Sequence, residues 1–390
     1  MSALLLDLTH TSHTAARTGI QRVTRALHRE LGAAAFPVTH DPYLGAWRGL
    51  EPWELANLAD DAAGSTRRAT WPLLARWRGQ WRRATNRSEA FALRGDYQGF
   101  LTAEIFTAQA AATLPKFFPR VAVFHDAIAL RFPELSPGGT VARFPAYLQE
   151  LLKFDGIAAN SDESRDSLLG YWRWLGVKNP PPITAISLGV DPPRQATTSS
   201  LPVPTNSAGP TVLSVGTLEG RKNHLALLTA CEQLWTRGEK FELRIVGGVQ
   251  RQTGRAAYEK MRAMQLAGRP LRYDGPLGDT ALDAAYARCA FTVYPSLAEG
   301  FGLPVIESLA RGRPCICSAH GALGELSRSG GCLALESVDA AHLATAIARL
   351  LASPAELAEL AVAAQARTFK SWRTYAAEVA GWMAGLPRRD

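Results

Sequence analysis

The chain has 390 residues, of which 47% are hydrophobic and 20% are charged. This composition is typical of a globular protein and excludes a disordered chain, and the length predicts two domains or three. Lys and Arg outnumber Asp and Glu by 43 to 35, and the resulting charge of +8 leaves nucleic acid, a membrane surface or an anionic small substrate open as partners.

The first elements predict the start of a doubly wound α/β domain. Residues 4–6 form a short apolar run, and after a turn, apolar residues recur at helical spacing from Gly19. Further buried strands are expected over 121–124 and 156–159, since continuous apolar runs suit a parallel sheet covered on both faces.

The segment 66–87 carries nearly all of the net charge, because it contains seven Arg and no Asp or Glu. It predicts a helix capped by Thr70, with Leu74, Trp77 and Trp81 on one face. Two interpretations remain open: an interfacial helix on an anionic membrane, or a surface helix whose Trp side chains pack on the domain. Nucleic-acid binding is not expected, because no known nucleic-acid motif accompanies the patch.

A second α/β domain is predicted after a linker. Pro, Ser, Thr and Gly dominate 191–210, which indicates a linker between a first domain, 1–190, and a second, 211–370. The second domain alternates strands and helices, expected over 211–215, 224–235, 241–246, 281–288, 291–294, 305–310 and 314–317. Two such domains are expected to face a cleft, with ligands at the carboxyl ends of the strands.

The densest chemical pattern in the chain lies over 294–307, where a strand, a loop and a helix are predicted. Gly300 and Gly302 allow close backbone approach, and the free amides at the helix start suit a diphosphate. Glu299 and Glu307 are placed to hold hydroxyl groups of one ligand.

Arg221 and Lys222 follow the strand 211–215 and precede a helix. Cations do not stabilise a helix start, so a diphosphate ligand explains the pair better than a solvated surface position does.

The N-terminal domain offers two weaker candidates. His125 follows the strand 121–124 and should lie at the edge of the sheet, although a lone His is more often structural. Gly19 lies at a strand-to-helix turn, where a glycine often serves packing alone.

No metal site is expected. The sequence has no D-x-D pair and no C-x-x-C, and Cys315 and Cys317 alternate within a predicted strand as core residues. The five Cys favour a reducing cytoplasm, the first residues do not resemble a signal peptide, and no apolar run is long enough for a transmembrane helix.

Together these motifs resemble the retaining glycosyltransferases of family GT4. The resemblance is strongest over 211–335 and weaker over 1–190, and the segment E-G-F-G-L-P-V-I-E is similar to the family's E-x7-E motif. It implies the α/β GT-B fold, in which two Rossmann-like doubly wound domains face a cleft and a terminal helix, here 371–390, crosses back to the N-terminal domain.

The resemblance also implies roles for the donor-binding residues. Glu299 would contact the transferred sugar, Glu307 the ribose hydroxyls, and Lys222 the phosphates. Amides near the sugar and phosphates would come from Phe301, Gly302 and Leu303, beside Gly300. One position departs from the family, since Thr217 stands where an Arg is common, and this leaves open whether Arg221 or Lys222 is the main phosphate contact.

Three further assignments follow from the same resemblance. His125 would lie near the sugar and assist catalysis, and Gly19 would border the diphosphate. The segment with Pro276 and Leu277 would meet the nucleobase through backbone atoms, without revealing which base.

The implied function is transfer of a hexose, with mannose favoured, from a nucleotide-diphosphate sugar to a hydroxyl of a glycan or lipid-linked acceptor. Two routes to retention remain open, double displacement and same-face attack, and the second is favoured because the sequence offers no convincing nucleophile. The reaction is expected to need no metal or cofactor and to belong to polysaccharide or glycolipid synthesis of the bacterial type. A cytoplasmic enzyme that reaches the inner membrane face through 66–87 is expected. The alternatives are a nucleotide-sugar epimerase or phosphorylase of the same fold, and a non-catalytic sugar-nucleotide binding subunit.

Overall fold

The computed structural model describes the chain except residues 1–2, 15, 17, 59–68, 86–92, 94, 192–208 and 389–390. The described chain forms two compact units. The N-terminal unit comprises Met1–Asp126, Ala142–Gly189 and Trp372–Asp390, and the C-terminal unit comprises Ala127–Val141 and Val190–Ser371. Most of the predicted linker 191–210 lies outside the described residues, as do Arg67, Arg68 and Arg87 of the basic segment.

The N-terminal unit is built on a seven-stranded sheet in the order β3-β2-β1-β4-β5-β6-β7. Neighbouring strands are parallel except for β2 and β3. The strands are β1 (Leu4–Asp7), β2 (Ala35–Asp41), β3 (Ala46–Gly49), β4 (Phe100–Thr102), β5 (Arg120–Phe124), β6 (Gly156–Ala159) and β7 (Ile183–Ala185). The predicted strands at β1, β5 and β6 are confirmed, whereas the sequence did not indicate the other four.

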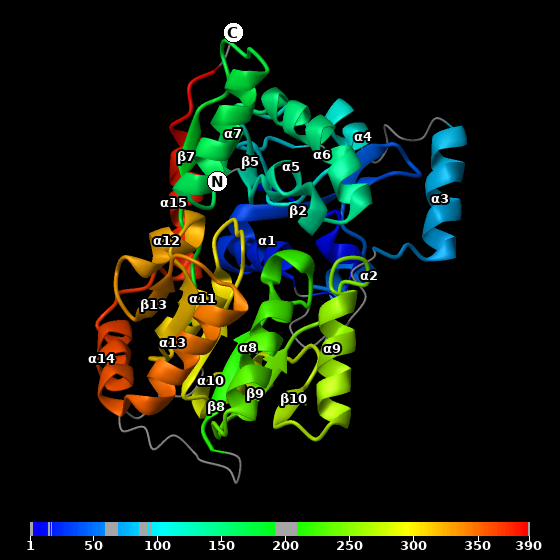
Figure 1. Ribbon diagram of the computed structural model, residues 1–390. Coiled ribbons are helices and arrows are strands. Elements are labelled where there is room, and N and C mark those ends of the chain that lie inside the picture. Colours follow the sequence, from blue (N-terminus) through cyan, green and yellow to red (C-terminus); the bar gives the residue numbers. More distant parts are fainter. Residues whose placement is uncertain are drawn as a thin grey trace. The chain divides into compact units, whose positions relative to one another are not determined.

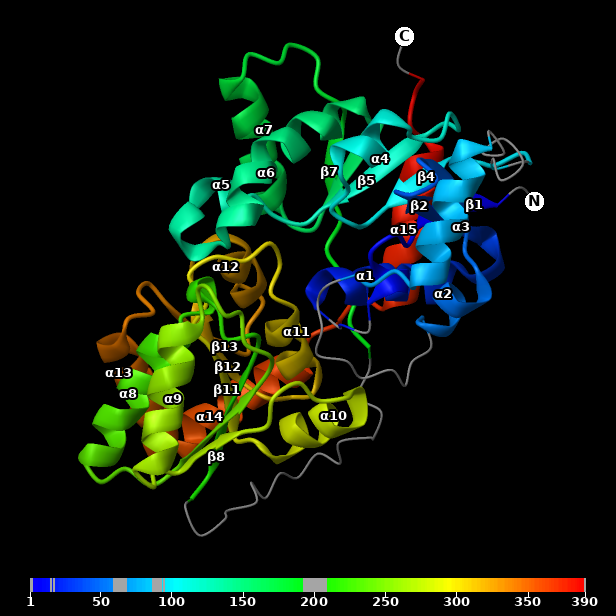
Figure 2. The same cartoon turned by 90° about the vertical axis from the view of Figure 1, so that its right-hand side faces the viewer.

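Helices cover this sheet, and the last of them comes from the far end of the chain. The helices of this part are α1 (Gly19–Leu31), α2 (Pro52–Ala56), α3 (Leu73–Ala84), α4 (Ala108–Ala112), α6 (Gly138–Glu150), α7 (Asp162–Trp174) and α15 (Trp372–Ala384). Figures 1 and 2 show α15 beside α1. Gly156 permits this packing, because a Cβ there would lie 2.7 Å from Leu386 and Trp382. The expected return of the terminal helix to the N-terminal domain is confirmed.

The C-terminal unit has a six-stranded parallel sheet in the order β10-β9-β8-β11-β12-β13. Its strands are β8 (Thr211–Val215), β9 (Glu242–Val246), β10 (Leu271–Tyr273), β11 (Phe291–Tyr294), β12 (Cys315–Ser318) and β13 (Cys332–Leu335). Its helices are α5 (Ile128–Arg131), α8 (His224–Thr236), α9 (Arg255–Leu266), α10 (Asp279–Arg288), α11 (Leu303–Ala310), α12 (Gly321–Ser327), α13 (Ala340–Ala352) and α14 (Pro354–Gln365). The structure thus confirms two doubly wound α/β domains as the fold class.

Alternating strand residues divide the core of this unit between two helical layers. Ile316 packs with residues of α8, α9 and α13, whereas Cys315 and Cys317 pack with residues of α11 and α12. Successive side chains of a strand point to opposite faces, so the two cysteines share a face, as predicted. Both are fully buried, which confirms their assignment to the core.

The basic segment 66–87 forms the predicted helix, with two corrections. Thr70 is not its cap, because the helix begins at Leu73 after Pro72, and no side chain caps it. The predicted apolar face is exposed, so the interpretation in which these Trp side chains pack on the domain is wrong for Trp77 and Trp81. It holds for Trp71, whose ring stacks on that of His13 at 3.9 Å. Among the described residues, no helix is both long and apolar enough to cross a membrane.

A buried charged cluster stabilises the N-terminal unit near β2 and β3. Arg48 donates to both carboxylate oxygens of Glu54, at 2.7 and 2.9 Å, and to Asp41 at 3.0 Å. The ring of His13 lies 2.9 Å from the same Glu54 carboxylate. Burial opposes ionisation of Glu54, but hydrogen bonds from His13 and Arg48 outweigh it and lower the pKa of Glu54 to about 2.

We expect Glu54→Gln to lower the free energy of unfolding at pH 7 by about 1.5–3 kcal/mol, because the buried Arg48 keeps Asp41 but loses its charged hydrogen bonds to Glu54. Since the folded pKa lies below the ordinary value of 4.5, ionised Glu54 stabilises the protein above pH 4.5, and this contribution is lost as the pH falls towards 2. Urea unfolding of the full chain at pH 7, 5, 4 and 3 should therefore show a difference in the free energy of unfolding between the unmodified protein and Glu54→Gln. This difference should narrow below pH 4.5.

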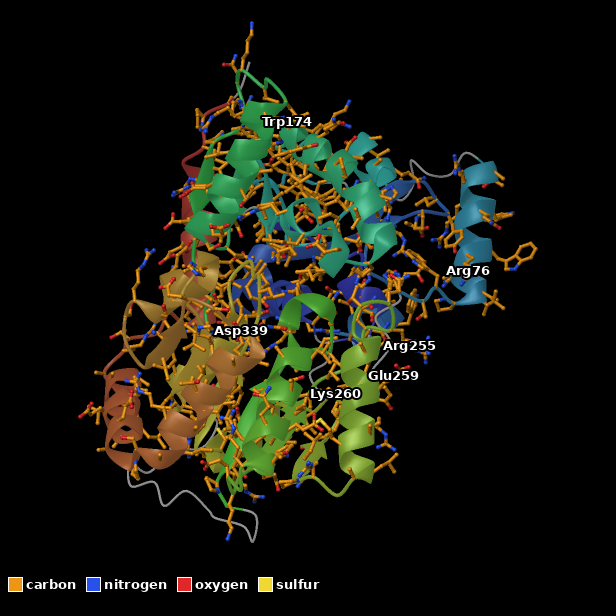
Figure 3. All side chains as sticks on the ribbon, in the orientation of Figure 1. Arg76, Trp174, Arg255, Glu259, Lys260 and Asp339 are labelled. Atoms are coloured by element: carbon orange, nitrogen blue, oxygen red, sulfur yellow. The ribbon has the colours of Figure 1, made fainter. Side chains whose placement is uncertain are left out.

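The matched control is Glu259→Gln. Glu259 pairs with Arg255 on the surface of α9 (Figure 3), and loss of this exposed, solvent-screened pair should leave the free energy of unfolding almost unchanged. A difference for Glu54→Gln that stays constant from pH 7 to pH 3 would contradict the role assigned to the ionised carboxylate.

Candidate functional site in the C-terminal unit

The loops that follow β8 and β11 bring Arg221, Lys222 and Glu299 together. The two strands are parallel neighbours, so both loops leave the same edge of the sheet. Arg221 lies 2.6 Å from one carboxylate oxygen of Glu299, and Lys222 lies 2.5 Å from the other. The amide of Leu297 donates to the carbonyl of Arg221 at 2.8 Å and joins the backbones of the two loops. The predicted catalytic residue Glu299 and two of the predicted donor-binding residues thus form one cluster.

Two members of this cluster were not predicted. The hydroxyl of Tyr294 bonds with Lys222 and donates to Glu299 at 3.0 Å, and the hydroxyl of Ser296 also donates to Glu299. Tyr294 is the last residue of a buried strand, where its ring looks like a core residue in the sequence. In the sequence, only the position of Tyr294 at the carboxyl end of the strand indicates a role in the site.

The charges of the cluster hold Glu299 ionised. Burial opposes ionisation, but Arg221 and Lys222 outweigh it and lower the pKa of Glu299 to about 2. Burial and the nearby Arg221 lower the pKa of Lys222, against the opposing effect of Glu299. Burial and the charge of Glu299 raise the pKa of Tyr294 well above its ordinary value, so this hydroxyl stays a neutral donor.

Arg221 has a second carboxylate partner, because Glu219 lies 2.9 Å from its guanidinium. Arg221 would therefore keep a carboxylate partner if Glu299 turned away from it. The ion pair of Lys222 is with Glu299 itself. The two cations are thus unequal: Lys222 is buried and tied to Glu299, and Arg221 is partly exposed and shared between two acids.

His224 follows these cations and begins α8. Burial and the neighbouring Lys222 lower the pKa of His224 to about 3, so its ring is neutral at physiological pH. Among the described residues, its Nδ1 has no hydrogen-bond partner although it is buried. No motif in the sequence distinguishes this residue.

The glycine loop and the start of α11 have the predicted backbone. Gly302 has a φ of +110°, and a Cβ there would lie 2.6 Å from Leu323, so the position requires glycine. Gly300 precedes it, and Phe301 and Leu303 on either side of Gly302 are buried. The loop thus leads directly into the helix N-terminus. Pro304 has no amide hydrogen and the amide of Val305 donates to Gly302, so the amides that can bind an anion here are those of the loop and of Leu303.

Glu307 forms a hydrogen bond with a different element from those that form the cluster around Glu299. It is buried on α11, and its carboxylate accepts a hydrogen bond from Tyr286 of α10 at 3.1 Å. Glu299 accepts hydrogen bonds from Lys222, Tyr294 and Ser296, so the two carboxylates bond to side chains of different elements.

The predicted base region follows the edge strand β10. Gly275 accepts a hydrogen bond from Gly247 at 2.9 Å, and Pro276 lies beside Gly248 in the loop after β9. Leu277 packs on the core residues around α10. Pro276 and Leu277 therefore lie at the same edge of the sheet as the loops of β8 and β11.

His125 lies at the carboxyl end of β5, in the N-terminal unit. Its Nε2 bonds with the carbonyl of Ala103 at 2.7 Å, and its Nδ1 accepts from Asn160 at 2.9 Å. Burial lowers the pKa of His125, so the ring is neutral. These bonds fix the ring orientation, and both ring nitrogens have partners inside the unit.

Gly19 also lies in the N-terminal unit, at the first position of α1 and directly after Thr18. Thr18 and Gln21 are hydrogen-bonded through their side chains, and Gln21 contacts His10 at 3.0 Å. The predicted helix start at Gly19 is confirmed. Among the described residues of both units, no three His, Cys, Asp or Glu side chains are grouped as a metal site would require.

Sequence comparison matches residues 200–367 to the family described as Glycosyl transferases group 1. The serotype-specific mannosyltransferase WbdA of Escherichia coli is 28% identical over 338 residues, which are 80% of this chain and 38% of WbdA. The chain therefore spans little more than a third of the length of this relative.

Two solved structures share the fold over almost the whole chain. Sucrose-phosphate synthase from Thermosynechococcus elongatus aligns with a TM-score of 0.69 and 20% identity, covering 98% of each chain. Anabaena HepE, solved in complex with UDP and glucose, aligns with a TM-score of 0.68 and 16% identity, covering 99% of this chain and 100% of HepE. Residues 200–367 thus match the Glycosyl transferases group 1 family, and the likeness to these solved structures shows the GT-B fold for the chain.

Proposed function

We propose that the protein is a retaining glycosyltransferase that moves a hexose from a nucleotide-diphosphate sugar to a hydroxyl of a glycan or lipid-linked acceptor. The observation that carries this proposal is the cluster of Arg221, Lys222 and Glu299, which lies within the region matched by the family. Mannose is favoured as the sugar because the relative WbdA is named a mannosyltransferase. Synthesis of a polysaccharide or glycolipid is the process that fits such an acceptor.

In this proposal the cations of the cluster stabilise the leaving nucleoside diphosphate. Lys222 offers a compact charge and Arg221 a planar fork, and the amides at the start of α11 add partial positive charge. No metal is required for this charge balance. Glu299 turns to the transferred sugar, and Glu307 holds the ribose hydroxyls, for which its position on a separate element is suited.

Retention follows, in the same proposal, from attack on the face that the leaving group departs from. The glycosidic bond to the diphosphate breaks, the acceptor oxygen bonds to the anomeric carbon, and the leaving phosphate accepts the proton of the acceptor. His125 would take part as a neutral hydrogen-bonding ring, since its low pKa excludes a cationic role at neutral pH. Gly19 would border the diphosphate, and Pro276 and Leu277 would line the base.

The proposed location is the cytoplasm, at the inner face of a membrane. The five cysteines are free thiols in the structure, which suits a reducing compartment. Four of the five are buried.

The proposal predicts that one nucleoside diphosphate stabilises the full chain strongly. In thermal-shift measurements with UDP, GDP, ADP, CDP and dTDP, the cognate ligand at 100 times its Kd should add about 2.7 kcal/mol of stability. The monophosphate of the same base is the control and should give a smaller shift, because the cation cluster then has less charge to bind. The absence of a shift with every diphosphate would count against donor binding.

Donor consumption separates this function from its alternatives. With the donor sugar linked to the base found in the panel, a transferase should release nucleoside diphosphate faster when acceptor glycans are added. An epimerase would change the sugar without releasing the nucleotide, a phosphorylase would require phosphate, and a non-catalytic subunit would consume no donor.

A further inference from the structure

Helix α3 presents a large apolar face that is mostly exposed in the described part of the chain. Leu73, Leu74, Trp77 and Trp81 are 70%, 77%, 71% and 56% exposed. At 100° per residue their side chains fall within an arc of about 100° on the helix surface. Burying such side chains is favourable, so a continuous exposed arc of this kind marks an interaction surface.

The opposite face fixes the helix on the N-terminal unit. It is formed by the small residues Ala75 and Gly79, both buried. A Cβ on Gly79 would lie 2.7 Å from Tyr43 and 3.2 Å from the amide of Leu44, so the helix backbone lies directly on this loop. Figure 1 shows α3 at the edge of the N-terminal unit. The apolar arc therefore points away from the domain because the small face is packed, and its exposure is a property of the docked helix.

Arginines border the apolar arc on both sides. Helical spacing places Arg78 and Arg82 along one border and Arg76 and Arg83 along the other. Arg78 and Arg82 contact Glu51 of the domain, at 2.8 and 3.6 Å, while the segment 66–87 itself contains no acid. Glu51 thus neutralises part of the charge on one border, and the four arginines leave the surface around the arc positive overall.

We propose that α3 is a membrane-docking helix that lies in the headgroup region of an anionic bilayer. Its Leu and Trp side chains would enter the boundary of the acyl chains, and the arginines on both borders would bind lipid phosphates. The charge pattern favours a membrane as the partner, because positive side chains on both borders of the arc match a uniformly anionic surface. A groove of another protein would instead require charges matched position by position. This inference deepens the proposed location at a membrane by naming the docking element, and it does not depend on the proposed glycosyl transfer.

Vesicle binding by the full chain tests the proposal directly. Flotation with vesicles of phosphatidylcholine containing 30% phosphatidylglycerol should recover the protein, and pure phosphatidylcholine vesicles should recover much less. The triple variant Leu74→Ser, Trp77→Ser, Trp81→Ser should bind anionic vesicles at least about 10-fold more weakly, since it removes most of the inserted apolar area. Replacing Arg76, Arg78, Arg82 and Arg83 by Gln should reduce binding by about 50-fold or more, because each cation near the surface contributes about fivefold.

Two exposed residues elsewhere serve as matched controls (Figure 3). Trp174 on α7 is 78% exposed in the same unit, and Trp174→Ser should leave vesicle binding unchanged. Arg255 on α9 is an exposed Arg of the other unit, and Arg255→Gln should also have no effect. Circular dichroism and the nucleotide-induced thermal shift of every variant should match the unmodified protein, which separates loss of docking from loss of folding or donor binding.

Several results would overturn the inference. They are failure of the unmodified chain to bind anionic vesicles, equal binding to neutral and anionic vesicles, and binding that survives both sets of α3 substitutions. If the triple variant instead abolished self-association measured by sedimentation without lipid, the apolar arc would be a contact between two copies of this chain.

Discussion

Lys222→Gln should weaken binding of the cognate nucleoside diphosphate by about 10- to 100-fold. A hydrogen bond to a charged group contributes about 1.5–3 kcal/mol, and glutamine keeps the size of the side chain while removing its charge. Lys222 is buried, so no water replaces its charge, and it pairs with Glu299 at 2.5 Å. The variant should also melt at a lower temperature, because Glu299 remains ionised beside one cation in place of two.

Isothermal titration with the diphosphate found by thermal shift measures this effect. The control is Lys260→Gln, because Lys260 pairs with Glu232 at 2.5 Å on the surface formed by α8 and α9 of the same unit (Figure 3). Its diphosphate affinity should equal that of the unmodified protein. Unchanged affinity in Lys222→Gln would assign the main phosphate contact to Arg221.

Glu299→Gln should change binding and turnover in opposite directions. The carboxylate of Glu299 neutralises both Arg221 and Lys222, so an incoming diphosphate competes with it for the same cations. Removing this charge should tighten nucleoside diphosphate binding by about 10-fold. This corresponds to an interaction free energy of about 1.4 kcal/mol, which is the equivalent of one pKa unit. Release of nucleoside diphosphate from the donor sugar should nevertheless slow by about 100- to 1,000-fold, because Glu299 no longer holds the transferred sugar.

The same titration, together with single-turnover measurement of donor breakdown, tests both halves of this expectation. Glu232→Gln is the control, since its carboxylate lies in the same unit and pairs with Lys260 on the surface. A parallel loss of affinity and turnover in Glu299→Gln would mean that Glu299 supports the nucleotide itself, and the competition between carboxylate and diphosphate would then be wrong.

The sequence predicted the longer, mostly apolar strands better than the short ones, and the missed strands include β4 at the centre of the first sheet. The strands β1, β5, β8 and β11 are predominantly apolar and buried, and such segments are visible in one sequence. The strands β4, β7 and β10 have only three residues each, too few for a pattern. The hairpin of β2 and β3 was not predicted, because some of its buried positions hold polar residues that pair with each other. The sequence therefore does not show the alternation of apolar and polar residues that is typical of a strand.

The candidate site was predictable where backbone conformation and charge determine it. Gly302 stands where a positive φ and a close contact exclude other residues, and the cations and Glu299 follow adjacent strands of one sheet. Tyr294 and His224 could not be assigned from sequence, because their roles arise from contacts across the fold. For α3 the helical period was predicted, but which face would be buried depended on the close fit of Gly79 against Tyr43, which sequence alone does not reveal.

The three-part construction of the N-terminal unit bears on how the protein is made. Strands β1 to β7 leave the ribosome first, yet α15, which packs over Gly99 and Gly156, is synthesised only after the whole C-terminal unit. At about 5–20 residues per second, this delay amounts to roughly 10 to 40 s, during which the nascent sheet lacks its cover. The first unit to emerge is thus the last to be completed, and its uncovered apolar surface is a binding target for chaperones during translation.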